Sequence, residues 1–245
     1  MRTLLIDGDI LVVSTGFSCE REVDWGDDEW SLHVDLKEVK ESILTSIDWL
    51  QRELDADAYK ICLSRGETFR HRLSPSYKAG RGRKPVGTNA VKDWLVEEHG
   101  AVLKPDIEAD DIMGIYATHP RLIKGETVIV SSDKDMLTIP GQLYREGSLM
   151  EVTEGEARYN WLCQTLTGDS TDGYPGVPGI GPTKARKILD AIDFQDPGWW
   201  KEIEKVFISN GLSEEDALLQ ARLARILHAS DYDFKKKEVR LWVPQ

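Results

Sequence analysis

The order of apolar and polar positions predicts strands that alternate with helices along most of the chain. Short apolar runs typical of buried strands lie at residues 3–6, 58–63, 101–104 and 127–131. Residues 35–54 show helical spacing instead, because one face collects Leu36, Val39, Ile43, Ile47 and Leu50. Further elements are predicted as helices at 89–98, 107–118 and 155–167 and as short segments at 142–145 and 149–152. This alternation predicts an α/β fold whose mostly parallel central sheet carries helices on both faces.

Three stretches depart from this pattern. Residues 19–34 are polar and contain tryptophan, and residues 64–88 are basic and rich in Gly and Pro, which predicts a loop or a loosely helical excursion. Beyond Gly168, turns fill residues 173–182 and helices are predicted at 183–192, 199–209 and 213–229. We therefore expect a core over residues 1–167 and a helical region over residues 168–245, whose end (KKEVRLWVP) is compatible with an edge strand.

Composition narrows the class of protein without identifying it. The formal charge of −12 has the wrong sign for a simple DNA-coating protein, although carboxylates that hold metal ions would also make a chain acidic. Three widely spaced cysteines without a CxxC pair argue against a disulfide framework or a zinc site. Asp7 and Asp9 interrupt the apolar N-terminal run, and no stretch approaches the roughly 18 apolar residues of a membrane span. We expect a cytoplasmic protein with no membrane partner.

Acidic residues gather where the predicted strands end and the next helices begin. They are Asp7, Glu108, Asp110, Asp111, Asp133, Asp135, Asp169 and Asp172. Ligands of parallel sheets bind at the carboxyl ends of the strands, and hard oxygen ligands suit Mg²⁺ or Mn²⁺. Two such ions, about 3.5–4 Å apart, would activate a water and stabilise the leaving oxygen of a phosphodiester. The structural alternative is that single acidic residues only cap helix N-termini.

The basic segment offers a surface for nucleic acid. Between its ends lie seven cations and one acid, Glu67; the cations are Arg65, Arg70, Arg72, Lys78, Arg81, Arg83 and Lys84. With Phe69 and Tyr77 interleaved, this composition suits phosphate contacts combined with base stacking. Lys78 or Arg83 could neutralise the scissile phosphate in the transition state. A solvated surface loop is the alternative interpretation.

A glycine-rich turn before a basic helix predicts a second phosphate contact. Residues 174–187 read YPGVPGIGPTKARK, and the residues expected to meet a DNA backbone are Gly176, Gly179, Ile180, Gly181, Lys184, Arg186 and Lys187. Glycines let backbone N–H groups approach a phosphate, and a helix N-terminus favours negative charge. An ordinary Pro/Gly turn between two helices is the alternative.

Taken together, these motifs resemble the flap endonuclease/5′→3′ exonuclease superfamily, and most closely its short phage 5′-exonucleases. The resemblance spans nearly the whole chain, through IDGD, PSYKAGR, EADD, SSDKD, GDSTDG, GVPGIG and ARILHASDYDF. It implies a PIN/5′-nuclease-like core with an arch or gateway at about 64–88, followed by a DNA-binding region with a helix–three-turn–helix element at about 173–192.

The resemblance also implies roles for individual residues. The first metal site would be formed or supported by Asp7, Glu108, Asp110, Asp111 and Asp133, and the second by Asp135, Asp169 and Asp172. Asp111 and Asp133 would belong to the catalytic residues together with Lys78 and Arg83. Tyr77 would stack on a base, Lys78 would act in catalysis, and Arg81, Arg83 and Lys84 would be gateway cations.

One position departs from the family pattern. After the second strand, members usually carry a further aspartate, but this chain reads LSRGE with Arg65 near that place. Either Glu67 substitutes for the aspartate, or one ligand is missing and Arg65 contacts a phosphate.

We therefore predict a structure-specific 5′-nuclease that uses two Mg²⁺ ions, with Mn²⁺ as a substitute, and acts on DNA with a 5′ end, nick or flap. RNA in RNA–DNA hybrids is a further possible substrate, replication in a phage is the expected setting, and no required protein partner is evident. One alternative is a PIN-like ribonuclease, against which the turn carrying Lys184 argues. Another is a non-catalytic DNA-junction binder, suggested by Arg65.

Overall fold

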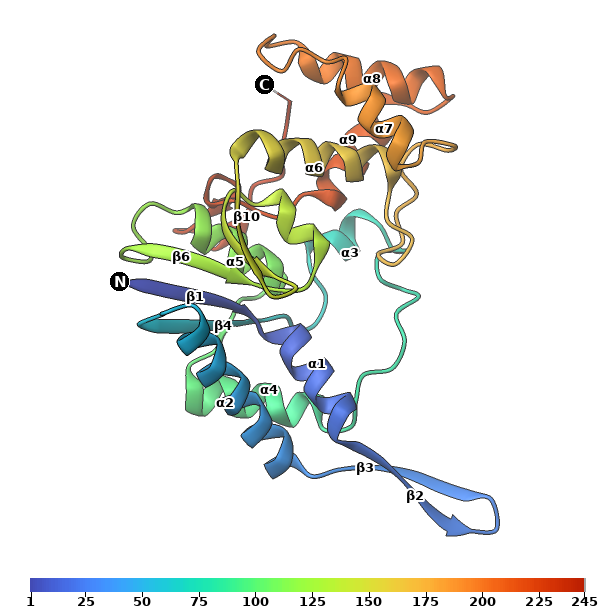
Figure 1. Cartoon of the computed structure of the whole chain (residues 1–245). Coiled ribbons are helices and arrows are strands. Elements are labelled where there is room, and N and C mark those ends of the chain that lie inside the picture. The colour runs from blue at the N-terminus through green and yellow to red at the C-terminus, as the bar shows by residue number, and fades with distance from the viewer. Residues whose placement is uncertain (245) are drawn as a thin grey trace.

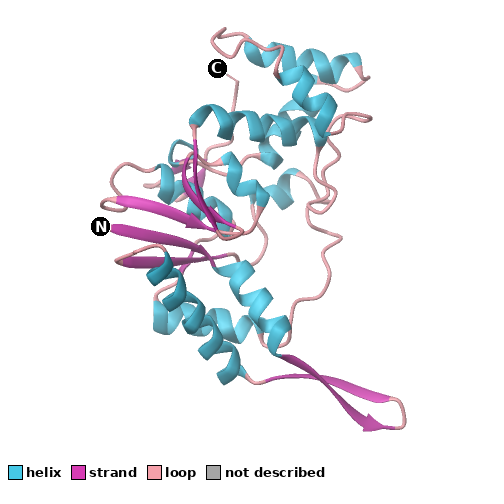
Figure 2. Ribbon diagram, viewed as in Figure 1, coloured by secondary structure: helices cyan, strands magenta, loops and turns pink. Residues whose placement is uncertain are grey.

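A six-stranded sheet forms the centre of the molecule in the computed structural model, which describes residues 1–244 (Figures 1 and 2). Its strand order is β5-β4-β1-β6-β7-β8, and all neighbours run parallel except β7 and β8. The strands are β1 (Arg2–Asp7), β4 (Ala58–Leu63), β5 (Val102–Leu103), β6 (Glu126–Val130), β7 (Gly141–Arg145) and β8 (Ser148–Val152). The predicted mostly parallel sheet is confirmed.

Alternate residues of β1 serve two separate cores, because successive side chains of a strand point to opposite faces. Leu4 and Ile6 pack with α1 (Gly8–Cys19), α2 (Leu36–Glu53) and α4 (Thr88–His99) on one face. Leu5 packs on the other face with α5 (Ala109–Thr118) and the 3-10 helix η1 (Lys134–Thr138). Helices therefore cover both faces of the sheet, as the sequence predicts.

Helix α2 illustrates how directly the pattern specifies an element. Asp35 caps its first turn by accepting a hydrogen bond from the Lys37 amide at 2.8 Å. The predicted apolar face is buried at Val39, Ile43, Ile47 and Leu50.

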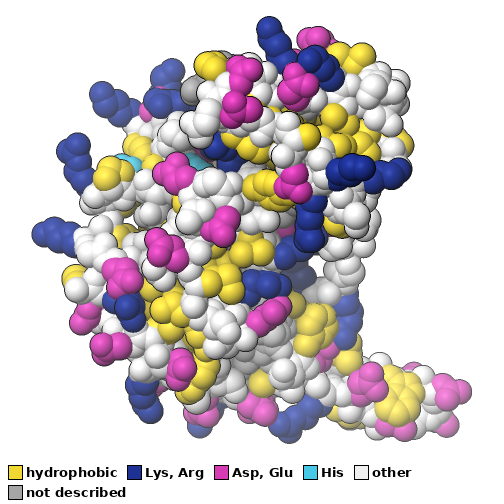
Figure 3. All heavy atoms as spheres, turned by 45° about the horizontal axis from the view of Figure 1, so that its top comes forward, with side chains coloured by type: hydrophobic (Ala, Val, Ile, Leu, Met, Phe, Trp, Pro, Cys, Tyr) yellow, Lys and Arg dark blue, Asp and Glu magenta, His cyan; other side chains and the backbone are white. Residues whose placement is uncertain are grey.

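The polar stretch after α1 forms a two-stranded arm. β2 (Glu20–Gly26) and β3 (Glu29–Val34) pair only with each other, and the hairpin projects from the body of the molecule (Figures 1 and 3). Figure 3 shows acidic side chains gathered on it around an apolar group. Both of its tryptophans, Trp25 and Trp30, are exposed.

The C-terminal helices enclose a third core. It lies between α6 (Glu154–Thr167), α7 (Pro182–Leu189), α8 (Trp199–Ser209) and α9 (Glu214–Ala224), and α6 also packs against η1. The helix predicted over 213–229 is wrong beyond Ala224, because Arg225 adopts an extended conformation. A short 3-10 helix, η2 (Ala229–Asp231), follows. β9 (Tyr232–Asp233) and β10 (Glu238–Val239) then pair with each other instead of extending the central sheet.

Among residues 1–244, no helix has the length and apolar character needed to span a membrane.

Candidate active site

The acidic side chains converge at the carboxyl edge of the parallel strands. Asp7 ends β1 and caps α1 by accepting a hydrogen bond from the Ile10 amide at 3.0 Å. Asp133 follows β6, and Asp110 lies in the first turn of α5. All three line one cavity of about 440 Å³, together with Asp9 and Glu108. The sheet edge therefore brings together carboxylates that are more than 120 positions apart in sequence, such as Asp7 and Asp133. The Ser131 hydroxyl also reaches Asp7 and donates a hydrogen bond to it at 2.7 Å, across a separation of 124 positions.

Two carboxylates at this edge, Asp7 and Asp110, have a raised pKa. Burial, the largest cause, raises the pKa of Asp7 to about 6, and the charges of Asp9 and Asp133 add to it. Burial likewise raises the pKa of Asp110 well above its ordinary value, with further increases from Asp7, Glu108 and Asp133. Asp110 has no partner from the protein, since in the described chain its carboxylate forms no ion pair and accepts no hydrogen bond.

A second acidic group lies beside the first. Burial raises the pKa of Asp135 to about 7, and Asp133, Asp172 and Asp169 contribute to the increase. Gln164 on α6 orients Asp135 by donating a hydrogen bond from Nε2 to Oδ1 at 2.7 Å. Burial also acts to raise the pKa of Asp169, but hydrogen bonds from Lys134 and backbone amides outweigh it and the pKa is lowered. The two groups meet at Asp133 and Asp135.

Asp111 is held by the protein itself, so its predicted role as a metal ligand requires correction. The Arg70 guanidinium donates to Oδ1 at 2.7 Å and to Oδ2 at 2.8 Å, and the amides of Leu227 and Glu108 donate to the same two oxygens at 3.0 Å. Asp111 is 0% exposed, which leaves no free direction for an ion. It anchors the start of α5, from which Asp110 projects.

Glu108 is also engaged by cations. Lys78 donates to its Oε1 at 2.6 Å, while Tyr77 and Arg70 donate to its Oε2 at 2.9 and 3.2 Å. Burial acts to raise the pKa of Glu108, but Arg70 and Lys78 outweigh it and lower that pKa to about 2. Glu108 therefore stays ionised and connects the basic segment to the acidic edge.

Two residues of the basic segment face inward, contrary to their predicted contact with nucleic acid. Arg70, in the short helix α3 (Phe69–Leu73), is 1% exposed and pairs with Asp111 and Glu108. Tyr77 is 3% exposed, and its hydroxyl donates to Glu108 or Asp172. The sequence reveals charge and aromaticity but not direction, and here the buried carboxylates draw both side chains into the protein.

The remaining cations of the segment divide between the cavity and the surface. Lys78, Arg81, Lys84 and Arg65 line the same cavity as the carboxylates. Arg81 pairs with Asp172 at 2.9 Å, and Arg65 pairs with exposed Asp93 at 2.5 Å. Arg83 does not line the cavity, because it pairs with Glu20 at the base of the hairpin. Figure 1 shows the segment between α3 and α4 running along one side of the molecule, from the C-terminal helices to α4.

The glycine-rich turn also divides into buried and exposed parts. Gly176 is buried, its amide donates to Gln220 at 2.9 Å, and a Cβ there would lie 2.2 Å from the Gly168 nitrogen. Its predicted contact with DNA therefore requires correction, because close packing of two backbone segments explains this glycine. The predicted residues at the surface are Gly179, Gly181, Lys184, Arg186 and Lys187, with Ile180 half-buried.

Lys92 is a site residue that the sequence analysis overlooked. It is 4% exposed on α4, and its Nζ donates to the Asp9 carboxylate and to the Ser64 carbonyl oxygen at 2.9 Å. The available signal was a lysine between Val91 and Trp94, on a helix face that is otherwise apolar. Gln164 and Ser131 gave no such signal, because their roles depend on contacts between distant segments.

The donors at this edge fit hard divalent cations. They are carboxylate oxygens, and Asp110 presents one group with no partner from the protein. No three Asp, Glu, His or Cys side chains within residues 1–244 already form a cage for one ion. Mg²⁺ does not require such a cage, since it is commonly bound by one or two carboxylates, waters and substrate phosphates.

The chain is similar in sequence to several known proteins. The family model described as "5′-3′ exonuclease, N-terminal resolvase-like domain" matches residues 2–156. The exonuclease of Escherichia phage T7 is 30% identical over 98% of this chain and 93% of its own length. The exodeoxyribonuclease of Enterobacteria phage T3 is 28% identical over 99% and 93%, respectively. The flap endonuclease Xni of Shewanella piezotolerans is 35% identical over 50% of this chain and 54% of its own.

Solved structures share the fold at low sequence identity. A phage T5 5′-exonuclease mutant superimposes with a TM-score of 0.61 at 17% identity, over 91% of this chain and 87% of the other. The phage T5 flap endonuclease in a complex with DNA and metal ions gives 0.61 at 17% identity, over 91% and 89%.

Proposed function

The chain belongs to the 5′-3′ exonuclease family, and from this premise we propose which of its residues carry out the reaction and with which metal. The protein is a metal-dependent 5′-nuclease that hydrolyses phosphodiester bonds of DNA at or near 5′ ends. The observation that carries the assignment of its active site is the half-buried Asp110 carboxylate, which has no protein partner and lines one cavity with Asp7 and Asp133.

Two groups of carboxylates would hold two Mg²⁺ ions. The first ion would be held by Asp7, Asp110 and Asp133, and the second by Asp135, Asp169 and Asp172. Asp111 and Glu108 would position these ligands. Mg²⁺ suits a site of few carboxylates that leaves room for water and phosphate, and Mn²⁺ shares these ligand preferences. When bound, such a pair supplies an activated water and stabilises the leaving oxygen.

The chain's own cations would bind and orient the DNA strand. Lys78 and Arg81 lie between the two acidic groups, at 2.6 Å from Glu108 and 2.9 Å from Asp172. A phosphate entering the cavity would compete with these carboxylates for Lys78 and Arg81. The two cations would then neutralise the charge of the phosphate. Lys84 lines the same cavity, so the segment over residues 64–88 would act as the gateway past which the strand enters.

The exposed turn and helix α7 would hold the adjoining duplex. Gly179 and Gly181 leave backbone N–H groups accessible, and Lys184, Arg186 and Lys187 add positive charge in the same stretch. These contacts involve the DNA backbone and carry no sequence information. Binding to duplex DNA should therefore be independent of sequence and should weaken as salt increases.

A cleavage assay on three substrates tests this proposal. A 5′-flap, a nicked duplex and a blunt duplex, each labelled at the 5′ end, are incubated with Mg²⁺, Mn²⁺ or EDTA; an RNA–DNA hybrid and single-stranded RNA test for ribonuclease activity. Asp110→Asn and Asp135→Asn should abolish cleavage of DNA while duplex binding persists. Asp57→Asn, at a 60% exposed carboxylate, is the matched control and should cleave normally. Cleavage at the wild-type rate by both site variants would contradict the assigned ligands.

A further inference from the structure

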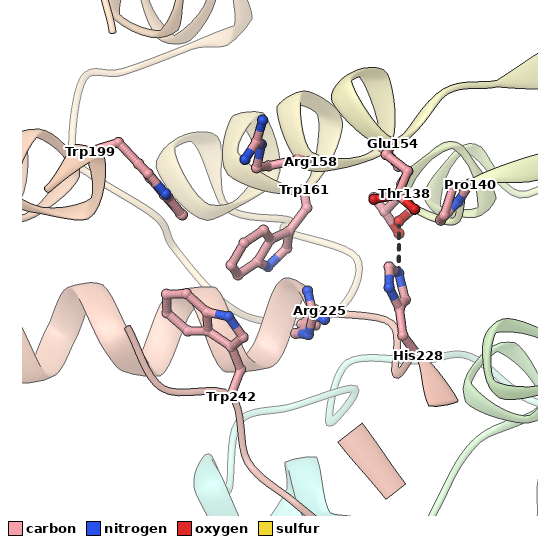
Figure 4. A pocket seen from close by; sticks show the side chains of 10 residues that line it. Thr138, Pro140, Glu154, Arg158, Trp161, Trp199, Arg225, His228 and Trp242 are labelled. Carbon is pink, nitrogen blue, oxygen red and sulfur yellow. Dashed lines mark hydrogen bonds between the residues drawn. The ribbon is translucent and has the colours of Figure 1, made fainter. Parts of the chain in front are cut away.

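A second cavity lies away from the carboxylate edge, among the C-terminal helices (Figure 4). Its volume of about 420 Å³ falls in the range of pockets for small organic ligands. Residues of η1, α6 and α8 line it, together with the segment after α9 and the C-terminal stretch around Trp242. The mechanism uses none of its side chains.

Three tryptophans give this cavity flat apolar walls. Trp161 and Trp242 have ring centroids 4.9 Å apart at an interplanar angle of 76°, and Trp199 lies 6.5 Å from Trp242 at 35°. Figure 4 shows the three indoles bordering the same space. Indole faces arranged in this way favour a planar aromatic ligand.

The charged side chains that line the cavity are two arginines, Arg158 and Arg225, and one carboxylate, Glu154. Arg158 has no carboxylate within ion-pair distance in residues 1–244, and its guanidinium lies 5.1 Å from the Phe194 ring. Arg225 stacks 5.0 Å from Trp161 but already pairs with Asp231 at 2.8 Å. Arg158 is therefore the group available to a ligand's negative charge.

We propose that this cavity binds a nucleotide, with its base against Trp199 and Trp242 and its phosphate at Arg158. The combination of a flat aromatic part and an anionic part follows from the lining, whereas the choice of a nucleotide over other aromatic anions rests on the proposed function. The ligand is either a free nucleoside 5′-monophosphate released by cleavage or one nucleotide of a single strand.

The position of the cavity suits a site that holds product or displaced strand near the reaction. Thr138 lines it and donates to the Asp135 carbonyl oxygen at 2.7 Å. Trp161 stands on α6 three residues before Gln164, whose amide holds the Asp135 carboxylate. The cavity is thus linked to the second acidic group through Thr138 and through α6.

Isothermal titration calorimetry in EDTA tests the proposal with defined probes. These are thymidine 5′-monophosphate, thymidine, inorganic phosphate and a ten-residue oligothymidylate, and the first and last distinguish the two sources. Arg158→Ala and Trp199→Ala should each weaken nucleotide binding at least about tenfold, since each removes a charge-assisted or stacking contact. The matched controls Arg121→Ala and Trp49→Ala, at surface positions outside the cavity, should bind like the wild type.

The titrations either support or overturn the proposed nucleotide site. Binding of either nucleotide probe that both cavity variants weaken supports the site. The proposal is overturned if neither probe binds or if the cavity variants bind normally. It is also overturned if Lys84→Ala, at the carboxylate cavity, weakens binding instead. Flap cleavage by the same variants is measured separately, so a failure of this site leaves the nuclease assignment untouched.

Discussion

Replacing Arg70 by methionine tests whether this cation is structural or contacts DNA. Methionine keeps much of the volume and removes the charge, at a side chain that is 1% exposed. In the described chain Arg70 is the cation paired with Asp111, which is 0% exposed. Glu108 would still have Lys78 as its ion-pair partner after the substitution. The substitution therefore leaves one fully buried carboxylate without a counter-charge.

The expected loss of stability follows from this geometry. Breaking a buried pair from one side costs about 3–5 kcal/mol, because the remaining charge stays buried. For a chain of this size, each kcal/mol lowers the melting temperature by about 2–4 °C, so a decrease of roughly 6–20 °C is expected. Arg70→Met/Asp111→Leu should recover only part of the loss, since two backbone amides that donate to Asp111 would remain unpaired.

Urea unfolding and thermal melts measure the effect. Arg65→Met is the control, because the Arg65–Asp93 pair is 43% and 51% exposed and exposed pairs contribute less than about 1 kcal/mol. A loss below about 1 kcal/mol in Arg70→Met, combined with weakened DNA binding, would refute the structural role. It would restore the interpretation that Arg70 contacts nucleic acid.

Three further perturbations test other parts of the site. Because burial raises the pKa of Asp135 to about 7, the folded protein binds a proton that the unfolded chain releases near pH 4. The contribution of Asp135 to the unfolding free energy in EDTA should therefore be largest near that lower pH and should be lost as the pH rises to about 7. Urea titrations of Asp135→Asn should show a smaller decrease of the unfolding free energy over this pH range, and an unchanged decrease would refute the assignment. Lys92→Met should free the Asp9 carboxylate and strengthen Mn²⁺ binding several-fold in calorimetry, and weaker binding would show that Lys92 supports the metal site. Gly173→Ala should lower both stability and cleavage, because its Cβ would meet a backbone oxygen at 2.3 Å; Gly211→Ala, at a similar positive φ in open space, controls for backbone strain alone.

The local pattern was sufficient for most of the fold. Helical periodicity and the Asp35 cap specify α2, and apolar runs specify β1 and β6, because burial of one face or of both faces is a property of neighbouring residues. Strand order in a mostly parallel sheet then places the ends of those strands at one edge, so the gathering of acidic residues there was also predictable.

Tertiary structure determined which of those acidic residues face the cavity and which are paired inside the protein. Asp110 and Asp111 are neighbours with the same side chain, yet α5 turns one toward the cavity and the other toward Arg70. Likewise the charge of Arg70 is evident in the sequence, but its burial depends on α3 packing beside α5 and the end of α9. Sequence alone determined that acidic groups gather at this edge of the sheet, because that follows from periodicity and strand order. Only the fold determined which of them keep a free oxygen or a free charge, because that depends on partners from distant segments.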